Sequence, residues 1–330
     1  MMEPFLLQSL AVPRVWGGRR IQEVFGLEAP VAGGANEGDV GGQPIGERWD
    51  VHGSLPVKGG PHAGRKLDEL VAEFGAKLTG TWSTGPTFPL LLKWLDCQDW
   101  LSIQVHPDDP TARRLTGDPN ALGKNECWYF YEVAESSELL HGWSTPPEDL
   151  TTLTGKDWLR LARRHHPAVG EWLHVPAGTI HALGPGLLLF EVQQSSDLTY
   201  RLYDWDRLGL DGVPRQLHLE EGSYCAGGFE LPPDPGPSEG VLGEERVRCP
   251  FFLVEEVSGP RAWSADPSSV EIVTCLKGEG RLAWEGSSLS LGLGDSVTIP
   301  AVSPGVTLTG SQNLKWARIR LAPPTEKFGA

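Results

Sequence analysis

The feature that most constrains the fold of this chain is its series of short apolar runs separated by turn-forming residues. The 330 residues include 41 glycines and 28 prolines, spread along the whole length. These turn formers separate runs rich in β-branched and aromatic side chains, which favour strands. We predict strands over residues 89–95, 101–105, 127–133, 170–175, 186–193, 252–257, 270–277, 280–284, 296–299 and 314–320. Many short strands between turns indicate an all-β protein.

A few short helices interrupt this pattern in the N-terminal half. Residues 66–78 carry leucine, valine and phenylalanine at helical spacing, and Gly80 can end that helix. Further helical segments are predicted over residues 109–115, where Asp109 and Pro110 start the turn, and over residues 146–153 and 157–166.

Charge and cysteine usage narrow the class of protein. The formal net charge is -15, which argues against nucleic acid or an anionic membrane as a partner. The five cysteines occur singly, without a C-x-x-C pair, so neither a zinc finger nor a disulfide framework is indicated. The N-terminus lacks a basic region followed by a long apolar run, and no stretch approaches the ~20 apolar residues of a membrane helix. We expect a soluble, cytoplasmic protein.

Two polar side chains lie together in the apolar sequence LSIQVHPDD. Gln104 and His106 are two residues apart, so an extended backbone projects both from the same face. An amide oxygen and an imidazole nitrogen aimed at one point form half of a metal site. Glu126, in GKNECWYFY, and His181, in WLHVPAGTIHAL, border other predicted strands and are candidates for the other half. Taken alone, a histidine in a strand is more often a packed core side chain than a metal ligand.

Several ordered motifs together resemble the type I mannose-6-phosphate isomerases, a family with the cupin fold. They are VWGGRRIQEVFG, IGERWDVHG, LLLKWLDCQDWLSIQVHPDD, GKNECWY, VPAGTIHAL and EVQQSSDLTYRLYDWDR. The resemblance runs from about Pro13 to about Arg207 and is nearest to the short bacterial form. Larger members of the family carry a substantial helical insertion, whereas this chain has a brief predicted helical region at residues 146–167.

The resemblance implies one zinc ion per chain. Its ligands would be Gln104, His106, Glu126 and His181. One carboxylate and three neutral donors suit a borderline divalent cation. Taken without the resemblance, these residues do not distinguish zinc from manganese or iron.

The reaction of the family removes a proton next to a carbonyl, so its site needs a base and a positive group beside the developing charge. The resemblance implies Arg201, Lys124, Glu191 and Asp197 as catalytic residues. Two alternatives stay open. Glu191, inside the apolar run LLLFEVQQ, could be a buried partner of Arg201, and Asp197 could cap a turn.

A phosphate group on the substrate needs polar and cationic donors. The resemblance maps Lys93, Ser102, Glu47 and Trp16 to the substrate pocket. Ser102 is two residues before Gln104, so in an extended strand both side chains can face one cavity. Lys93 lies in an otherwise apolar strand, where it either faces a wet cavity or marks an edge strand. Glu47 could instead be a carboxylate at the end of a strand.

An internal sequence repeat suggests a duplication. WLHVPAGTIHAL (172–183) resembles SVTIPAVSPGVTL (296–308), and setting Pro176 on Pro300 puts His181 on Gly305. We therefore predict two cupin-like (jelly-roll) β-barrels. The first is a catalytic domain over residues 1–230 with the short helices inserted, and the second is a metal-free domain over 241–330. The proline-rich residues 231–240 would link them.

The resemblance as a whole implies a zinc-dependent aldose–ketose isomerase that interconverts mannose 6-phosphate and fructose 6-phosphate through a cis-enediol. Its partner would be a small phosphosugar, and its oligomeric state is not indicated. One alternative is a non-enzymatic sugar-phosphate-binding or regulatory cupin, which would bind without turnover. Another is an iron-dependent oxygenase on the same fold.

Overall fold

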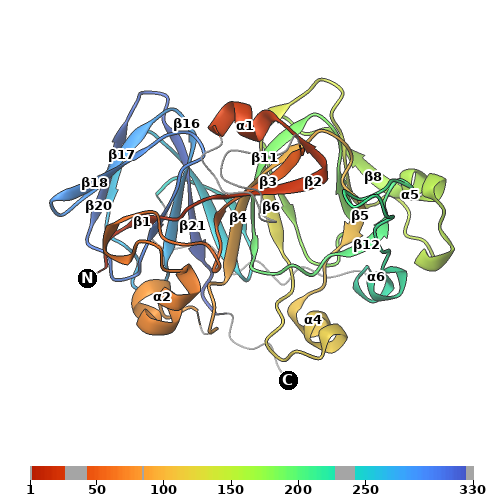
Figure 1. The fold of residues 1–330 in the computed structure, drawn as a ribbon, viewed down its shortest axis with the longest axis horizontal. Coiled ribbons are helices and arrows are strands. Elements are labelled where there is room, and N and C mark those ends of the chain that lie inside the picture. The colour runs from red at the N-terminus through yellow and green to blue at the C-terminus, as the bar shows by residue number, and fades with distance from the viewer. Residues whose placement is uncertain (1, 27–42, 84, 227–241, 325–330) are drawn as a thin grey trace. The chain divides into compact units, whose positions relative to one another are not determined.

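The computed structural model describes residues 2–26, 43–83, 85–226 and 242–324 (Figure 1). These residues are mostly in strands and turns, with short helices, so the all-β class is confirmed. The chain divides into two compact units. We call Leu10–Trp49 with Leu91–Leu231 the N-terminal unit, and Met1–Ser9, Asp50–Leu90 and Pro232–Ala330 the C-terminal unit.

The N-terminal unit contains two sheets. The six-stranded sheet has the order β2 (Leu10–Gly18), β3 (Ile45–Val51), β4 (Leu90–Cys97), β11 (Leu187–Gln194), β6 (Glu126–Val133), β9 (Trp172–Val175). The five-stranded sheet has the order β12 (Tyr200–Tyr203), β5 (Ile103–Val105), β10 (His181–Leu183), β7 (Leu139–Trp143), β8 (Ala162–His165).

Both sheets of this unit contribute to one hydrophobic core. Buried Leu95 and Phe130 come from the six-stranded sheet, and buried Leu139 and Leu183 come from the five-stranded sheet. The two sheets therefore pack face to face, with inward side chains alternating with outward ones along each strand.

The helices of the N-terminal unit are short. They are α1 (Arg20–Phe25), α4 (Asp109–Thr116), η2 (Leu150–Thr152), α5 (Gly155–Leu161) and α6 (Leu219–Cys225). Asp108 caps α4 by accepting a hydrogen bond from the backbone N–H of Thr111 at 2.8 Å, one residue before the predicted cap. The predicted helix over 157–166 is wrong beyond Leu161, because the chain becomes extended there and β8 pairs with β7.

The C-terminal unit repeats the two-sheet plan. Its six-stranded sheet has the order β1 (Phe5–Leu6), β19 (Ser296–Ile299), β16 (Glu271–Lys277), β21 (Lys315–Leu321), β14 (Phe252–Ser258), β13 (Glu244–Arg248). Its four-stranded sheet has the order β15 (Arg261–Trp263), β20 (Val306–Gly310), β17 (Gly280–Trp284), β18 (Ser287–Leu291). Val273 and Trp316 of the first sheet share a buried cluster with Leu282 and Leu308 of the second. Each unit is thus built as a jelly roll would be; closure into two barrels stays a prediction.

The helices of the C-terminal unit are η1 (Gly60–His62), α2 (Leu67–Phe74) and α3 (Ala76–Thr79). The predicted single helix over 66–78 is broken at Gly75, whose φ of 51° takes the backbone out of the helical region. Gly80, with φ 83°, ends α3 as expected.

Buried charges of the C-terminal unit are paired with one another. Arg318 forms an ion pair with Glu271 at 2.7 Å, and Arg320 forms one with Glu255 at 2.8 Å. The indole of Trp263 donates a further hydrogen bond to Glu271 at 2.8 Å. Such groups are tolerated in an interior only when their charges and hydrogen bonds are satisfied.

The compact units divide the chain differently from the predicted domains. Residues 1–9 and 50–90 belong with the C-terminal segment rather than with the predicted first domain. The contacts explain this grouping, since β1 pairs with β19, and the backbone N–H of Ala301 donates to Leu78 O. The predicted linker over 231–240 lies outside the described residues.

The internal sequence repeat has a local structural counterpart. Pro176 follows β9 and Pro300 follows β19, and the carbonyl of each proline accepts a hydrogen bond from the N–H three residues on, at 3.1 Å from Thr179 and 2.8 Å from Ser303. Two strands followed by the same tight turn support the predicted duplication.

Two further properties concern the class of protein. All five cysteines are buried and carry free thiols. Among the described residues, no helix combines the length and the apolar character that a membrane crossing requires.

Candidate active site

One row of the five-stranded sheet aligns three polar side chains. In the register of this sheet, Arg201 on β12 lies opposite Gln104 on β5, and Gln104 lies opposite His181 on β10. Residues directly opposite on neighbouring strands project from the same face. The three side chains therefore lie side by side, although they are far apart in the sequence.

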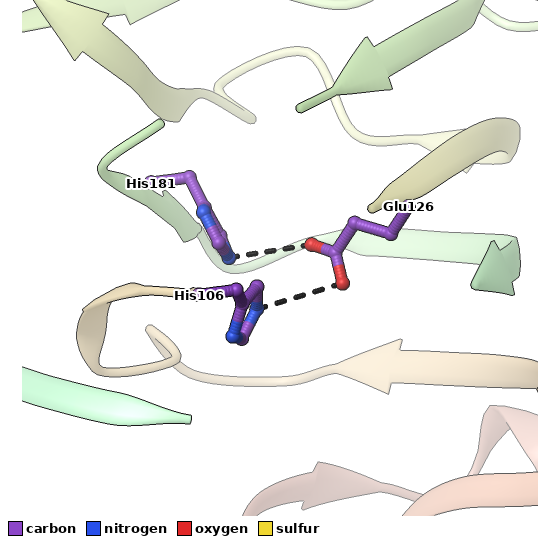
Figure 2. Close-up of side chains that lie close together, drawn as sticks. All are labelled: His106, Glu126 and His181. Carbon is purple, nitrogen blue, oxygen red and sulfur yellow. Dashed lines mark ion pairs between the residues drawn. The ribbon is translucent and has the colours of Figure 1, made fainter. Parts of the chain in front are cut away.

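Glu126 reaches the same place from the other sheet. It is the first residue of β6, and Figure 2 shows its carboxylate facing the rings of both His106 and His181. His181 Nε2 lies 3.3 Å from Glu126 Oε1, and His106 Nε2 lies 3.6 Å from Glu126 Oε2. All three side chains are buried, and their donor atoms lie within 4.8 Å of one another. We call His106, Glu126 and His181 the His–Glu–His cluster.

Backbone carbonyls fix the proton of each histidine. His106 Nδ1 donates to Leu198 O at 3.0 Å, and His181 Nδ1 donates to Thr179 O at 3.0 Å. A carbonyl can only accept, so the hydrogen of each neutral ring is on Nδ1. Each Nε2 therefore presents a lone pair toward Glu126. Metal-binding histidines are held in this way, by a hydrogen bond from the ring nitrogen that does not bind the metal.

The Nε2 lone pairs of His106 and His181 face the negatively charged carboxylate of Glu126. Such an arrangement is stabilised by a positive group between them. Burial, and then the nearby Lys124, lower the pKa of His106 well below 6.5, and burial lowers the pKa of His181 to about 4. Both rings are thus neutral near pH 7, so they do not themselves neutralise Glu126. The donor set fits a divalent cation because its nitrogens are already deprotonated and its carboxylate is charged.

Lys124 supplies positive charge to this cluster. Its Nζ lies 2.7 Å from Glu126 Oε2 and 3.2 Å from His106 Nε2. The ammonium therefore contacts two of the atoms that a metal ion would bind. Since one lone pair cannot serve both, a metal on His106 Nε2 requires Lys124 to give up this contact.

Gln104 completes the set of predicted ligands. Its side-chain nitrogen lies 3.1 Å from His181 Nε2, and its oxygen accepts from Ser102 Oγ at 3.1 Å. The two ends of an amide are assigned from such partners, and rotation by half a turn exchanges them. The turned amide would direct its oxygen to the cluster and its N–H to the Ser102 hydroxyl, so Gln104 also fits a metal site.

A second charged group lies beside the first. Lys93 Nζ is 3.3 Å from Glu191 Oε1 and 3.9 Å from Glu47 Oε1, and Lys124 Nζ is 3.6 Å from Glu191 Oε1. Burial, and then repulsion by Glu126, raise the pKa of Glu191 despite the two lysines. A carboxyl with a raised pKa exchanges a proton more readily near neutral pH.

Glu47 is held in the opposite state. Burial alone would raise its pKa, but Lys93, the guanidinium of Arg14 and a hydrogen bond from Trp49 lower it to about 2. Arg14 binds both carboxylate oxygens, at 3.0 Å and 3.1 Å. Glu47 is therefore a permanent anion, unlike Glu191.

These groups line one cavity of about 660 Å³ in the N-terminal unit. Its walls include eleven of the predicted site residues, namely Trp16, Glu47, Lys93, Ser102, Gln104, Lys124, Glu126, His181, Glu191, Asp197 and Arg201. His106 does not line the cavity itself but contacts it through Glu126 and Lys124. The volume is in the range of small-molecule sites.

Two alternatives considered from the sequence are wrong. Lys93 is not an edge-strand lysine, because β4 lies inside the six-stranded sheet and the residue is only 7% exposed. Glu191 is not the partner of Arg201, because its ion pairs are with Lys93 and Lys124.

The cavity also contains residues that were not predicted. Arg14, Trp49, Arg215 and His218 line it. Arg14 is two residues before Trp16, so strand alternation from Trp16 could have identified it. Arg215 and His218 follow β12 in a loop, where no periodic signal indicates which way a side chain points.

Comparison with known proteins agrees with this site. The sequence model of the type I phosphomannose isomerase catalytic domain matches residues 5–126. A mannose-6-phosphate isomerase from Streptococcus mutans is 35% identical over 312 residues, covering 91% of this chain and 93% of that protein. This chain belongs to the type I phosphomannose isomerase family.

Solved structures of phosphomannose isomerases share the fold. The mannose 6-phosphate isomerase of Bacillus subtilis has a TM-score of 0.78 and 29% identity, covering 96% of this chain and 99% of that one. The enzyme of Salmonella typhimurium, bound to fructose 6-phosphate and zinc, has a TM-score of 0.69 and 17% identity, covering 97% and 100%. At that identity the second comparison supports the fold alone.

Proposed function

We propose that the protein is a zinc-dependent mannose-6-phosphate isomerase that interconverts mannose 6-phosphate and fructose 6-phosphate through a cis-enediol. Family membership supports the reaction, and the His–Glu–His cluster supports the metal. Gln104, His106, Glu126 and His181 would hold one zinc ion per chain. When bound, zinc would stabilise negative charge that develops on the sugar oxygens.

The residues beside the cluster would move the proton. Removing a proton next to the carbonyl needs a base, and returning it to the neighbouring carbon needs the same group as an acid. Glu191, with its raised pKa, and Lys124, 3.6 Å from it, are the buried pair suited to this exchange. Arg201 and Asp197 complete the proposed catalytic set on the cavity wall, where Arg201 would offer the substrate a permanent positive charge.

The remaining predicted residues would hold the sugar. Ser102 lies next to Gln104, and Trp16 lines the same cavity with an aromatic face on which a sugar can pack. Lys93 and Glu47 are buried and paired, so they would fix the orientation of hydroxyl groups rather than supply free charge. We expect a small phosphosugar as the partner and a cytoplasmic location.

The convergence of two neutral imidazoles and a carboxylate on one point carries this proposal. It is tested by removing metal with a chelator, adding zinc, manganese or iron, and assaying mannose 6-phosphate isomerisation. Zinc-restored turnover supports the proposal. Binding of metal and sugar phosphate without turnover with any metal would instead favour a non-catalytic sugar-phosphate-binding cupin.

A further inference from the structure

The end of the cavity beyond Arg201 is built by the loop that follows β12. Moving across the five-stranded sheet, His181 is on β10, Gln104 on β5 and Arg201 on the edge strand β12. Two strand spacings separate β10 from β12, which is about 10 Å. The loop contributes Arg215 and His218 to the cavity. This end is therefore set apart from the His–Glu–His cluster.

Arg201 is the unpaired cation of the cavity. Arg14, Lys93, Lys124 and Arg215 each lie within 4.0 Å of a carboxylate, whereas Arg201 has no such partner among the described residues. Its Nη1 donates to Gln216 O at 2.9 Å, but its buried Nε has no hydrogen-bond partner in the described part of the chain. A buried charged donor without a partner is costly, so a ligand atom is expected there.

Arg215 lies near Arg201 and is held in place by Asp204, a carboxylate that it shares with Arg207. Asp204 accepts from Arg215 Nε at 2.7 Å and from Arg207 Nη2 at 3.0 Å. Arg207 also pairs with Asp99 at 3.2 Å. Arg201, Arg207 and Arg215 with Asp99 and Asp204 therefore carry one net positive charge, and Arg201 is the member without an ion pair among the described residues.

The other cations of the cavity are balanced. Lys93, Lys124 and Arg14 face three carboxylates, those of Glu47, Glu126 and Glu191. Asp197 and Asp211 also line the cavity, and neither forms an ion pair with a described residue. Among the described residues that line the cavity, Arg201 is thus the cation without a carboxylate partner, and Arg215 lies near enough to act on it electrostatically.

We propose that Arg215, together with Arg201, binds the phosphate group of the substrate at the end of the cavity away from the His–Glu–His cluster. This inference rests on the proposed function and adds the specificity-determining contact to it. A sugar phosphate carries a charge of about −1.5 to −2 at pH 7, and the planar guanidinium fork matches its oxygens. A hexose 6-phosphate has its phosphate at the opposite end from C1 and C2, as this separation of groups requires.

The test compares two arginines that share Asp204. Arg215 lines the cavity and Arg207 does not, so Arg215→Gln and Arg207→Gln each remove one of the two arginine partners of Asp204, with different expected effects on binding. We expect Arg215→Gln to raise KM for mannose 6-phosphate by about 10- to 100-fold, as for lost charge-assisted hydrogen bonds. The inhibition constant of inorganic phosphate should rise in parallel, while zinc content stays that of the wild type. Arg207→Gln should change both constants much less.

Equal shifts of KM in the two variants, or wild-type inhibition of Arg215→Gln by phosphate, would overturn the inference. If Arg215→Gln does not fold, Arg215→Lys keeps the charge without the fork, and a KM unchanged from wild type would then overturn it. Calorimetry with inorganic phosphate on wild type and variant separates this inference from the proposed function. Phosphate binding that depends on Arg215 supports the subsite even in a protein that does not turn over mannose 6-phosphate.

Discussion

The ammonium nitrogen of Lys124 lies 3.2 Å from Nε2 of His106, the ring nitrogen left without a proton by the hydrogen bond to Leu198 O. The lysine therefore occupies a position at which it competes with a metal ion for the same lone pair. Metal binding and the position of Lys124 are thus coupled, and the two effects can be separated by mutation.

Lys124→Met should retain zinc while losing turnover. Without the ammonium, His106 and Glu126 lose a competing cation, so zinc affinity should equal or exceed that of the wild type. Loss of a group that takes part in proton transfer should lower kcat by about 10²- to 10⁴-fold. Zinc content and steady-state kinetics measure the two effects. The exposed Lys156 provides the control, as Lys156→Met should leave both unchanged; wild-type kcat in Lys124→Met would contradict a role in proton transfer.

His106→Ala should lose metal and activity together. The substitution removes one of the neutral nitrogen donors and leaves Glu126 with fewer partners for a cation. Metal analysis after dialysis should give well under one zinc per chain, with turnover reduced in the same proportion. The exposed His166→Ala variant should keep wild-type values. Full activity in metal-free His106→Ala would show that the cluster is not needed for catalysis.

The metal-free protein should lose stability as the pH falls from about 6.5 toward 4. Burial lowers the pKa of His141 and of His174 to about 4 in the folded state, whereas both return to about 6.5 on unfolding. Between these values the unfolded chain binds more protons, so the free energy of unfolding rises with pH.

Urea unfolding at several pH values measures this dependence. The double variant His141→Asn, His174→Asn should show a shallower slope than the wild type over the same range, because two of the titrating groups are gone. An unchanged slope would mean that these two histidines do not contribute.

Glu271→Ala should strongly destabilise the C-terminal unit. It would leave Arg318 without its closest carboxylate and Trp263 without its hydrogen-bond acceptor. Breaking a buried ion pair costs about 3–5 kcal/mol. The exposed pair of Arg65 and Glu73 offers a matched control, since Glu73→Ala should cost less than about 1 kcal/mol. Similar losses for the two variants in urea unfolding would contradict the importance of burial.

Local patterns in the sequence predicted much of the fold. Strands over 280–284 and 296–299 match β17 and β19 in full. Alternation also placed Ser102 on the same face as Gln104. These inferences depend on the two-residue period of a strand, which any extended segment obeys.

Features of the fold and the site that depend on pairing between distant strands could not be predicted from the sequence. Beyond Leu161 the predicted helix over 157–166 is replaced by β8, because pairing with β7 outweighs local propensity. The row that aligns Arg201, Gln104 and His181 depends on strand register, which no local pattern specifies. Arg215 lies in a loop, where no periodic pattern indicates the direction of a side chain, so only the structure shows that it lines the cavity.

The central claim is that one zinc ion per chain makes the protein an isomerase. The most direct test measures how much mannose 6-phosphate turnover is recovered for each zinc ion bound. Chelator-stripped protein is titrated with zinc while bound metal and isomerase activity are measured on the same samples. The account predicts negligible activity without zinc and a linear recovery that ends at one zinc per chain. Full turnover in the metal-free protein, or one zinc bound per chain without recovery of activity, would contradict it.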